Sequence, residues 1–99
     1  MPNWPPYCFI ENDRTVGVPS RLLPAAQLVR NQASLQGPAL PDWKLDAVLP
    51  ALADRACDVI ARSAKAKQPF LLYLPLTAPH TPIAVAPEWR GRSALGHPY

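Results

Sequence analysis

Apolar and polar positions follow a helical period between residues 46 and 66, and this is the clearest pattern in the chain. Asp46 is placed to cap the N-terminus of the helix, and Pro50 falls in the first turn, where a missing N–H removes no hydrogen bond. The apolar positions recur at i, i+3 and i+4, and they are Leu49, Leu52, Ala53, Ala56, Cys57, Ile60 and Ala64. We predict one amphipathic helix over residues 46–66, with one face on a core and the other in solvent.

A second apolar stretch, residues 70–74 (FLLYL), is continuous instead of alternating. It is bounded by Pro69 and Pro75, and it is too short to cross a bilayer. Continuous apolar runs of this length are typical of strands buried on both faces. We therefore predict a short buried strand over residues 70–74, with the helix packed on it.

The chain before the helix carries weaker signals. Residues 7–10 are apolar, residues 11–14 form a polar turn, and Thr15 and Val16 can return as a second short strand, which predicts a small hairpin over residues 7–16. Residues 17–45 are rich in proline with little periodicity, and we predict a loop with a helical turn at 25–30. Such a long loop is uncommon in an independent domain. The elements together predict an α/β fold that is incomplete as a domain.

Composition excludes several classes of protein. The 99 residues include 14 prolines, but a hydrophobic content of 48% argues against a disordered chain. The net charge of +3 comes from scattered Lys and Arg residues, so we expect no nucleic-acid partner. Cys8 and Cys57 make neither a disulfide framework nor a metal site, and we expect two small buried hydrophobes. No segment of the sequence indicates a compartment, so localisation is left open.

The best candidate for chemistry is His80, which lies in a proline-rich loop over residues 75–99. Loops that follow the carboxyl ends of strands are where α/β sheets bind ligands. An imidazole there can bind an anion when protonated, or donate a hydrogen bond from either ring nitrogen. The competing interpretation is a surface or packed histidine. His80 and His97 alone do not make a metal site, and no Ser, His and Asp order is defined.

Residues 17–21 (GVPSR) share their last three letters with the C-x-P-S-R signature of sulfatases. The residue that those enzymes convert to formylglycine is Cys or Ser, and Gly17 has no side chain to oxidise. We interpret the match as chance. A second group of residues is interpreted as solvated loop charges without a catalytic role, namely Asp13, Arg14, Glu88, Arg90 and Arg92.

Several stretches taken together resemble an interior piece of an arylsulfatase, a member of the alkaline phosphatase-like superfamily. They are residues 7–14 (YCFIENDR), 46–50 (DAVLP) and 69–82 (PFLLYLPLTAPHTP), the last continued by 87–93 (PEWRGRS). The resemblance covers nearly the whole chain, and Pro-His-Thr-Pro at its strand end is the most specific part. It implies a partial alkaline phosphatase-like α/β fold, with residues 1–99 as an interior segment of a sulfatase catalytic domain.

The resemblance also implies a calcium-dependent sulfuric ester hydrolase. In such enzymes hydrated formylglycine attacks sulfur, the alcohol leaves, and the sulfated hemiacetal collapses to release sulfate. His80 matches the family histidine that contacts the sulfate group of the substrate. The nucleophile motif and the acidic metal ligands have no matching positions here. We therefore expect a chain that is inactive alone, with calcium and formylglycine held by the remainder of a longer sulfatase chain.

Two other functions stay open at this point. A phosphate or phosphonate ester hydrolase of the same superfamily is one, because His80 alone does not distinguish tetrahedral anions. A proline-rich interaction module is the other, suggested by Trp4-Pro5-Pro6, although no repeated P-x-x-P pattern supports it. The expectations for partners are a sulfate ester substrate, no nucleic acid and no membrane span.

Overall fold

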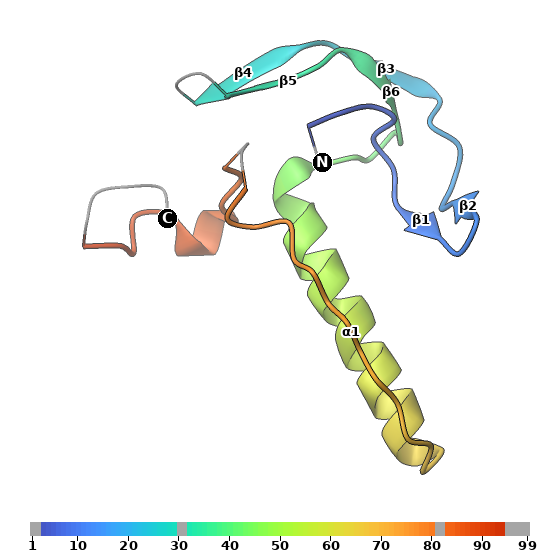
Figure 1. Ribbon diagram of the computed structural model, residues 1–99. Helices are drawn as coiled ribbons and strands as arrows, with labels where there is room; N and C mark the ends of the chain where they lie inside the picture. Colours follow the sequence, from blue (N-terminus) through green and yellow to red (C-terminus); the bar gives the residue numbers. More distant parts are fainter. Residues whose placement is uncertain (1–2, 30–31, 81–82, 95–99) are drawn as a thin grey trace.

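Short antiparallel strand pairs precede a long helix in the computed structural model, which describes residues 3–29, 32–80 and 83–94 (Figure 1). Thr81 and Pro82 of the Pro-His-Thr-Pro sequence, Arg30 of the predicted helical turn and residues 95–99 of the predicted loop lie outside this part. The elements are β1 (Ile10–Glu11), β2 (Arg14–Thr15), β3 (Arg21–Leu23), β4 (Ala26–Val29), β5 (Gln32–Ser34), β6 (Gly37–Ala39), the 3-10 turn η1 (Leu45–Ala47), α1 (Val48–Lys65) and the 3-10 turn η2 (Pro87–Trp89).

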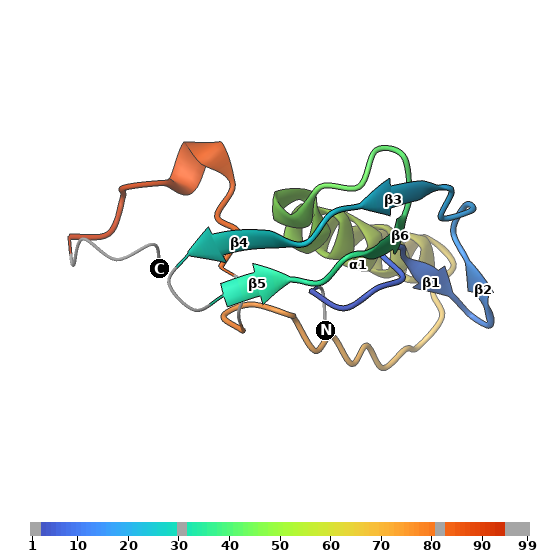
Figure 2. The ribbon, with the colours of Figure 1, turned by 90° about the horizontal axis from the view of Figure 1, so that it is seen from above.

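The named strands form three antiparallel pairs in the described residues. β1 pairs with β2, which confirms the predicted hairpin, while β4 pairs with β5 and β3 with β6. The last two pairs form one long ribbon across the molecule (Figure 2). The prediction of a loop over residues 17–45 was therefore wrong, and so was the helical turn at 25–30, because Ala26–Val29 is a strand. Antiparallel pairing satisfies backbone groups without requiring a regular apolar pattern, so the pattern gave no sign of it.

The buried centre of the strand region is Tyr7. Its backbone bridges Ala39 of β6 in parallel, with the Tyr7 N–H donating to the Pro38 carbonyl at 2.8 Å. Its phenolic oxygen lies 2.5 Å from the carbonyl oxygen of Leu35. Trp43 packs against the same place, with its ring centroid 6.1 Å from that of Tyr7. Tyr7 is therefore a main contact between the N-terminal segment and the ribbon, together with the Leu35 N–H, which donates to the carbonyl of Asn3 at 3.2 Å.

The predicted helix is confirmed as α1, preceded by η1. Asp46 does not cap it, since the N-cap is Ala47 and makes no side-chain hydrogen bond. Ala56 of the predicted apolar face is buried, and so is Val48, which was not assigned to that face, whereas Leu49 and Ile60 are exposed. Cys57 is exposed and Cys8 is only half-buried, so the expectation of two buried cysteines was wrong. The face that covers a core is narrower than the apolar stripe, and much of that stripe meets solvent.

The helix ends in a tight reversal of the chain. Lys67 has a φ of 51°, its N–H donates to the carbonyl of Ala64 at 3.1 Å, and the Gln68 N–H donates to that of Ser63 at 3.0 Å. This is the Schellman arrangement, with lysine at the left-handed position that glycine usually occupies. The reversal sends the following residues back along the helix.

Residues 69–76, here called the extended segment, run back along α1 (Figure 1). The predicted strand at 70–74 does not form: no ladder includes these residues within the part that the structure describes. A strand needs a neighbour as well as a suitable sequence, and Pro69 and Pro75 remove donors at both ends. The predicted packing of the helix on a buried strand was therefore wrong.

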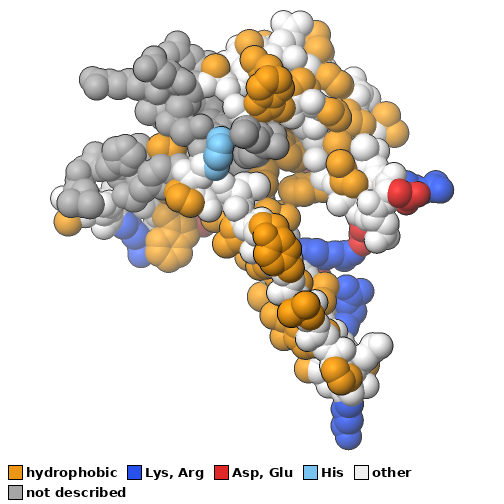
Figure 3. Space-filling model, in the orientation of Figure 1, with side chains coloured by type: hydrophobic (Ala, Val, Ile, Leu, Met, Phe, Trp, Pro, Cys, Tyr) orange, Lys and Arg blue, Asp and Glu red, His pale blue; other side chains and the backbone are white. Residues whose placement is uncertain are grey.

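Exposure along the extended segment alternates with the period of a strand. Leu71 is 97% and Tyr73 84% exposed, whereas Phe70 is 49% and Leu74 40% exposed and Leu72 is half-buried. One face is thus partly covered and the other meets solvent, and apolar side chains follow the segment along the surface (Figure 3). The side chains of the segment alternate as they do in a strand. In the described residues, however, no strand pairs with the segment, and Leu71 and Tyr73 on its outer face are exposed.

The whole is open. The radius of gyration is 15.8 Å, above the roughly 13 Å typical of a compact domain of about 100 residues. The fold mixes short antiparallel strands with one helix in the described residues, which is compatible with the α/β class, although no parallel sheet is present among them. No helix in the described part is long and apolar enough to cross a membrane.

Replacing Lys67 with Gly is expected to raise the free energy of unfolding by about 0.5–1 kcal/mol, because glycine adopts positive φ without steric strain. Urea denaturation followed by circular dichroism measures the change. The matched control is Lys65→Gly in the last turn of α1, which should lower the free energy of unfolding by about 1 kcal/mol. Destabilisation by both variants would contradict the left-handed conformation at Lys67.

Candidate functional site

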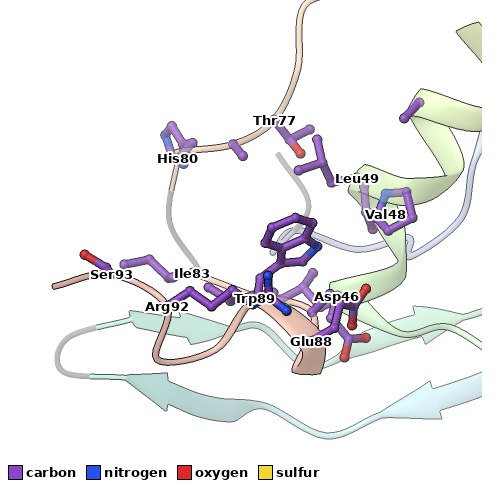
Figure 4. A pocket seen from close by; sticks show the side chains of 17 residues that line it. Asp46, Val48, Leu49, Thr77, His80, Ile83, Glu88, Trp89, Arg92 and Ser93 are labelled. Atoms are coloured by element: carbon purple, nitrogen blue, oxygen red, sulfur yellow. The ribbon is translucent and has the colours of Figure 1, made fainter. Parts of the chain in front are cut away.

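A groove of about 670 Å³ lies between the start of α1 and residues 83–94, here called the arm. Its apolar lining includes Leu45, Val48, Leu49, Ile83, Val85 and Trp89. Its polar lining comes from Asp46, Thr77, His80, Glu88, Arg92 and Ser93 (Figure 4). A mostly apolar hollow with a few polar groups is the usual form of a small-molecule site.

The helix builds one wall of the groove. Val48, Leu49 and Ala53 line it, and Leu49 and Ala53 share a face of α1 because residues four positions apart lie one above the other. Val48 is only 6% exposed, while Leu49 is 37% exposed. Val48 is therefore the buried part of this wall, and Leu49 is partly exposed to solvent.

The arm is tied to the helix start by Arg90. The Arg90 Nε–H donates to the carbonyl of Val85 at 2.9 Å, and a terminal nitrogen lies 3.8 Å from Oδ2 of Asp46. A partly exposed ion pair of this length contributes little to stability. It does connect the arm to η1, so that Asp46 serves the groove as an anchor and not as the predicted helix cap.

Trp89 and Arg92 form the inner surface of the arm. The guanidinium carbon of Arg92 lies 5.0 Å from the centroid of the Trp89 ring, a distance at which cation and ring attract each other. The N–H donors of a guanidinium lie in its own plane, so a guanidinium over a ring can still bind an anion at its edge. The ring stands in the middle of the groove (Figure 4).

His80 closes a turn at the end of the extended segment. Its backbone N–H donates to the carbonyl of Thr77 at 3.0 Å, and its side chain is exposed at the edge of the groove. In Figure 4 it lies on the far side of Trp89 from Asp46 and Glu88. The groove therefore has an imidazole at one end and carboxylates at the other.

The described residues do not fit a calcium ion. No group of three or more His, Cys, Asp and Glu side chains gathers among them in a way that could hold a metal. Asp46 and Glu88 line the groove, but Asp46 already has the Arg90 guanidinium nearby. We derive no chemical step through calcium for these residues.

The sequence located His80, but it assigned no role to its neighbours. Glu88 and Arg92 line the groove with it, although they were interpreted as solvated charges. The signal that could have paired Trp89 with Arg92 is their spacing of three positions, with Trp89 at the end of the proline-initiated turn η2. Residues 17–21 lie outside the groove lining, in keeping with a chance match at Gly17.

Comparisons of the chain with protein-family models, with curated proteins and with solved structures found no match.

Replacing Val48 with Ala is expected to lower the free energy of unfolding by about 1.5 kcal/mol, because it removes two buried methyl groups. Leu49→Ala removes three carbon atoms from the same wall, but since Leu49 is 37% exposed it should lower the free energy of unfolding by no more than Val48→Ala does. Denaturant unfolding of the two variants measures the difference. A larger loss of unfolding free energy for Leu49→Ala would contradict the burial of Val48 in the wall of the groove.

Proposed function

We propose that this chain is a segment of a sulfuric ester hydrolase of the arylsulfatase type, in which His80 contacts the sulfate group of the ester. The observation that carries the proposal is the place of His80. It stands directly after the extended segment, within the stretch that resembles the family most closely, and at the edge of an apolar groove. A ligand with an anionic head and an apolar body suits that combination.

The chemistry of the groove supports an ester of this kind. The backbone of His80 is held in a closed turn, and its imidazole N–H is a donor that could stabilise charge developing on the transferring group. Arg92 adds a permanent positive charge on the same groove, and hydrogen bonds to ionised acceptors are roughly twice as strong as neutral ones. Trp89 and the aliphatic lining offer apolar surface to the organic part of the ester.

In this proposal the chain binds and orients the sulfate ester but does not cleave it. Gly17 offers no nucleophile, and the described residues do not fit calcium. Formylglycine and calcium would belong to the remainder of a longer sulfatase chain, where they would supply the attacking oxygen and the charge that polarises the ester. A phosphate or phosphonate ester hydrolase would use His80 in the same way, so the anion must be decided by experiment.

The proline-rich stretch near the N-terminus favours the ester over an interaction module. A side chain at Gly37 would collide with the ring of Pro5, so Pro5 is packed against β6. A polyproline ligand needs its rings free to enter an aromatic-lined groove of a partner. Pro5 is instead part of the internal packing.

Phenyl sulfate is expected to bind the 99-residue chain weakly, because an anionic head can reach His80 and Arg92 while the ring enters the groove. NMR titration should move the side-chain signals of His80 and Trp89, and His80→Ala should weaken binding about tenfold or more. The matched control is His97→Ala, which changes the other histidine of the sequence. Phenyl phosphate tests the alternative anion. Equal binding by wild type and His80→Ala would remove His80 from the site.

The chain alone is expected to show no turnover of 4-nitrophenyl sulfate with calcium present, because the nucleophile and the metal ligands have no counterparts in it. Release of 4-nitrophenol is followed by absorbance over many hours, with an active sulfatase as the positive control. Turnover that persists through purification and disappears in His80→Ala would refute the view that this segment only binds and orients the ester.

A further inference from the structure

The extended segment presents a free backbone edge, and this feature goes beyond the proposed function. Among the described residues, no hydrogen bond between backbone groups involves Phe70 to Leu76. Yet exposure alternates along it as in a strand, with Leu71 and Tyr73 outward and Leu72 inward. Backbone N–H and C=O groups arranged in this way are a template for pairing with another strand.

The sequence of the edge is nearly the same read in both directions. Residues 69–75 read PFLLYLP, so that an antiparallel copy centred on Leu72 places Phe70 opposite Leu74, Leu71 opposite Tyr73 and Pro69 opposite Pro75. Every pair is then apolar with apolar. The prolines, which cannot donate to a ladder, fall together at the two ends where pairing stops. We propose that a second copy of this chain pairs with residues 69–75 in this register and forms a symmetric dimer.

The faces of the segment are consistent with that symmetry. A twofold axis through Leu72, perpendicular to the paired strands, keeps the Leu72 side chains of both copies on one face. The helix that each copy carries then lies on the same side of the joint ribbon. Leu71 of one copy meets Tyr73 of the other on the opposite face, and this contact covers part of the two most exposed apolar side chains of the segment.

Charge selects the antiparallel arrangement of two copies over a parallel one. No Asp, Glu, Lys or Arg occurs in residues 68–87, so the paired edges bring no like charges together. In the proposed register Lys67 faces Thr77 of the second copy. The two Lys67 residues are then ten positions apart along the ribbon, roughly 33 Å and well beyond the Debye length at physiological salt. A parallel in-register pair would set them side by side.

The test uses two double variants at the same exposed positions. Leu71→Lys with Tyr73→Lys, the Lys/Lys variant, places like charges opposite each other across the twofold axis. Leu71→Lys with Tyr73→Glu, the Lys/Glu variant, places opposite charges there. We expect a dimer for the wild type by light scattering and analytical ultracentrifugation. The Lys/Lys variant should raise the dissociation constant about tenfold or more, and the Lys/Glu variant should restore dimers. Circular dichroism verifies that α1 is retained in each.

Mixing two oppositely charged variants provides a second test of the pairing. A double variant with Leu71→Glu and Tyr73→Glu should be monomeric alone and should form a one-to-one dimer with the Lys/Lys variant, because every pair across the axis then joins a lysine with a glutamate. A monomeric wild type would overturn the proposal and would leave the edge to strands of a longer chain. Equal dimerisation by the Lys/Lys and Lys/Glu variants would overturn the register. Loss of phenyl sulfate binding would leave the dimer untouched, so the two proposals fail separately.

Discussion

The reversal at Lys67 is the constraint on which the candidate site depends. Two backbone hydrogen bonds close the end of α1 and turn the chain by nearly half a circle. A helix of 18 residues is about 27 Å long, and nine residues of extended chain span about 30 Å. The segment that starts at Pro69 therefore arrives at the other end of the helix near Thr77. His80 reaches the first turn of α1 because these two lengths match.

The arm and the extended segment both leave large apolar side chains exposed, among them Trp89, Leu71 and Tyr73. The arm has one short turn, η2, and its place is set by Arg90, which contacts the backbone of Val85 and the carboxylate of Asp46. The extended segment has the composition of a buried strand but lies on one helix with its edges uncovered. The groove between them holds an imidazole and a guanidinium, yet no nucleophile at position 17 and no metal site among the described residues.

The sequence by itself determined the features that depend on neighbouring residues. The helix over residues 46–66 was readable because its apolar positions repeat with the helical period, and the hairpin because a polar turn separates two short apolar runs. His80 was singled out by its position after an apolar stretch, which is also a local property. None of these predictions required contacts between residues that are distant in the sequence.

The tertiary structure alone decided the features that depend on partners. Residues 70–74 have the sequence of a strand and are not one, because no neighbour offers a ladder, while the weakly patterned residues 17–45 form strands because they pair with one another. Trp89, Arg92 and Asp46 join His80 only through the reversal at Lys67 and the Arg90 contact. Strand pairing and groove formation are interactions at a distance along the chain, and no periodicity within one segment records them.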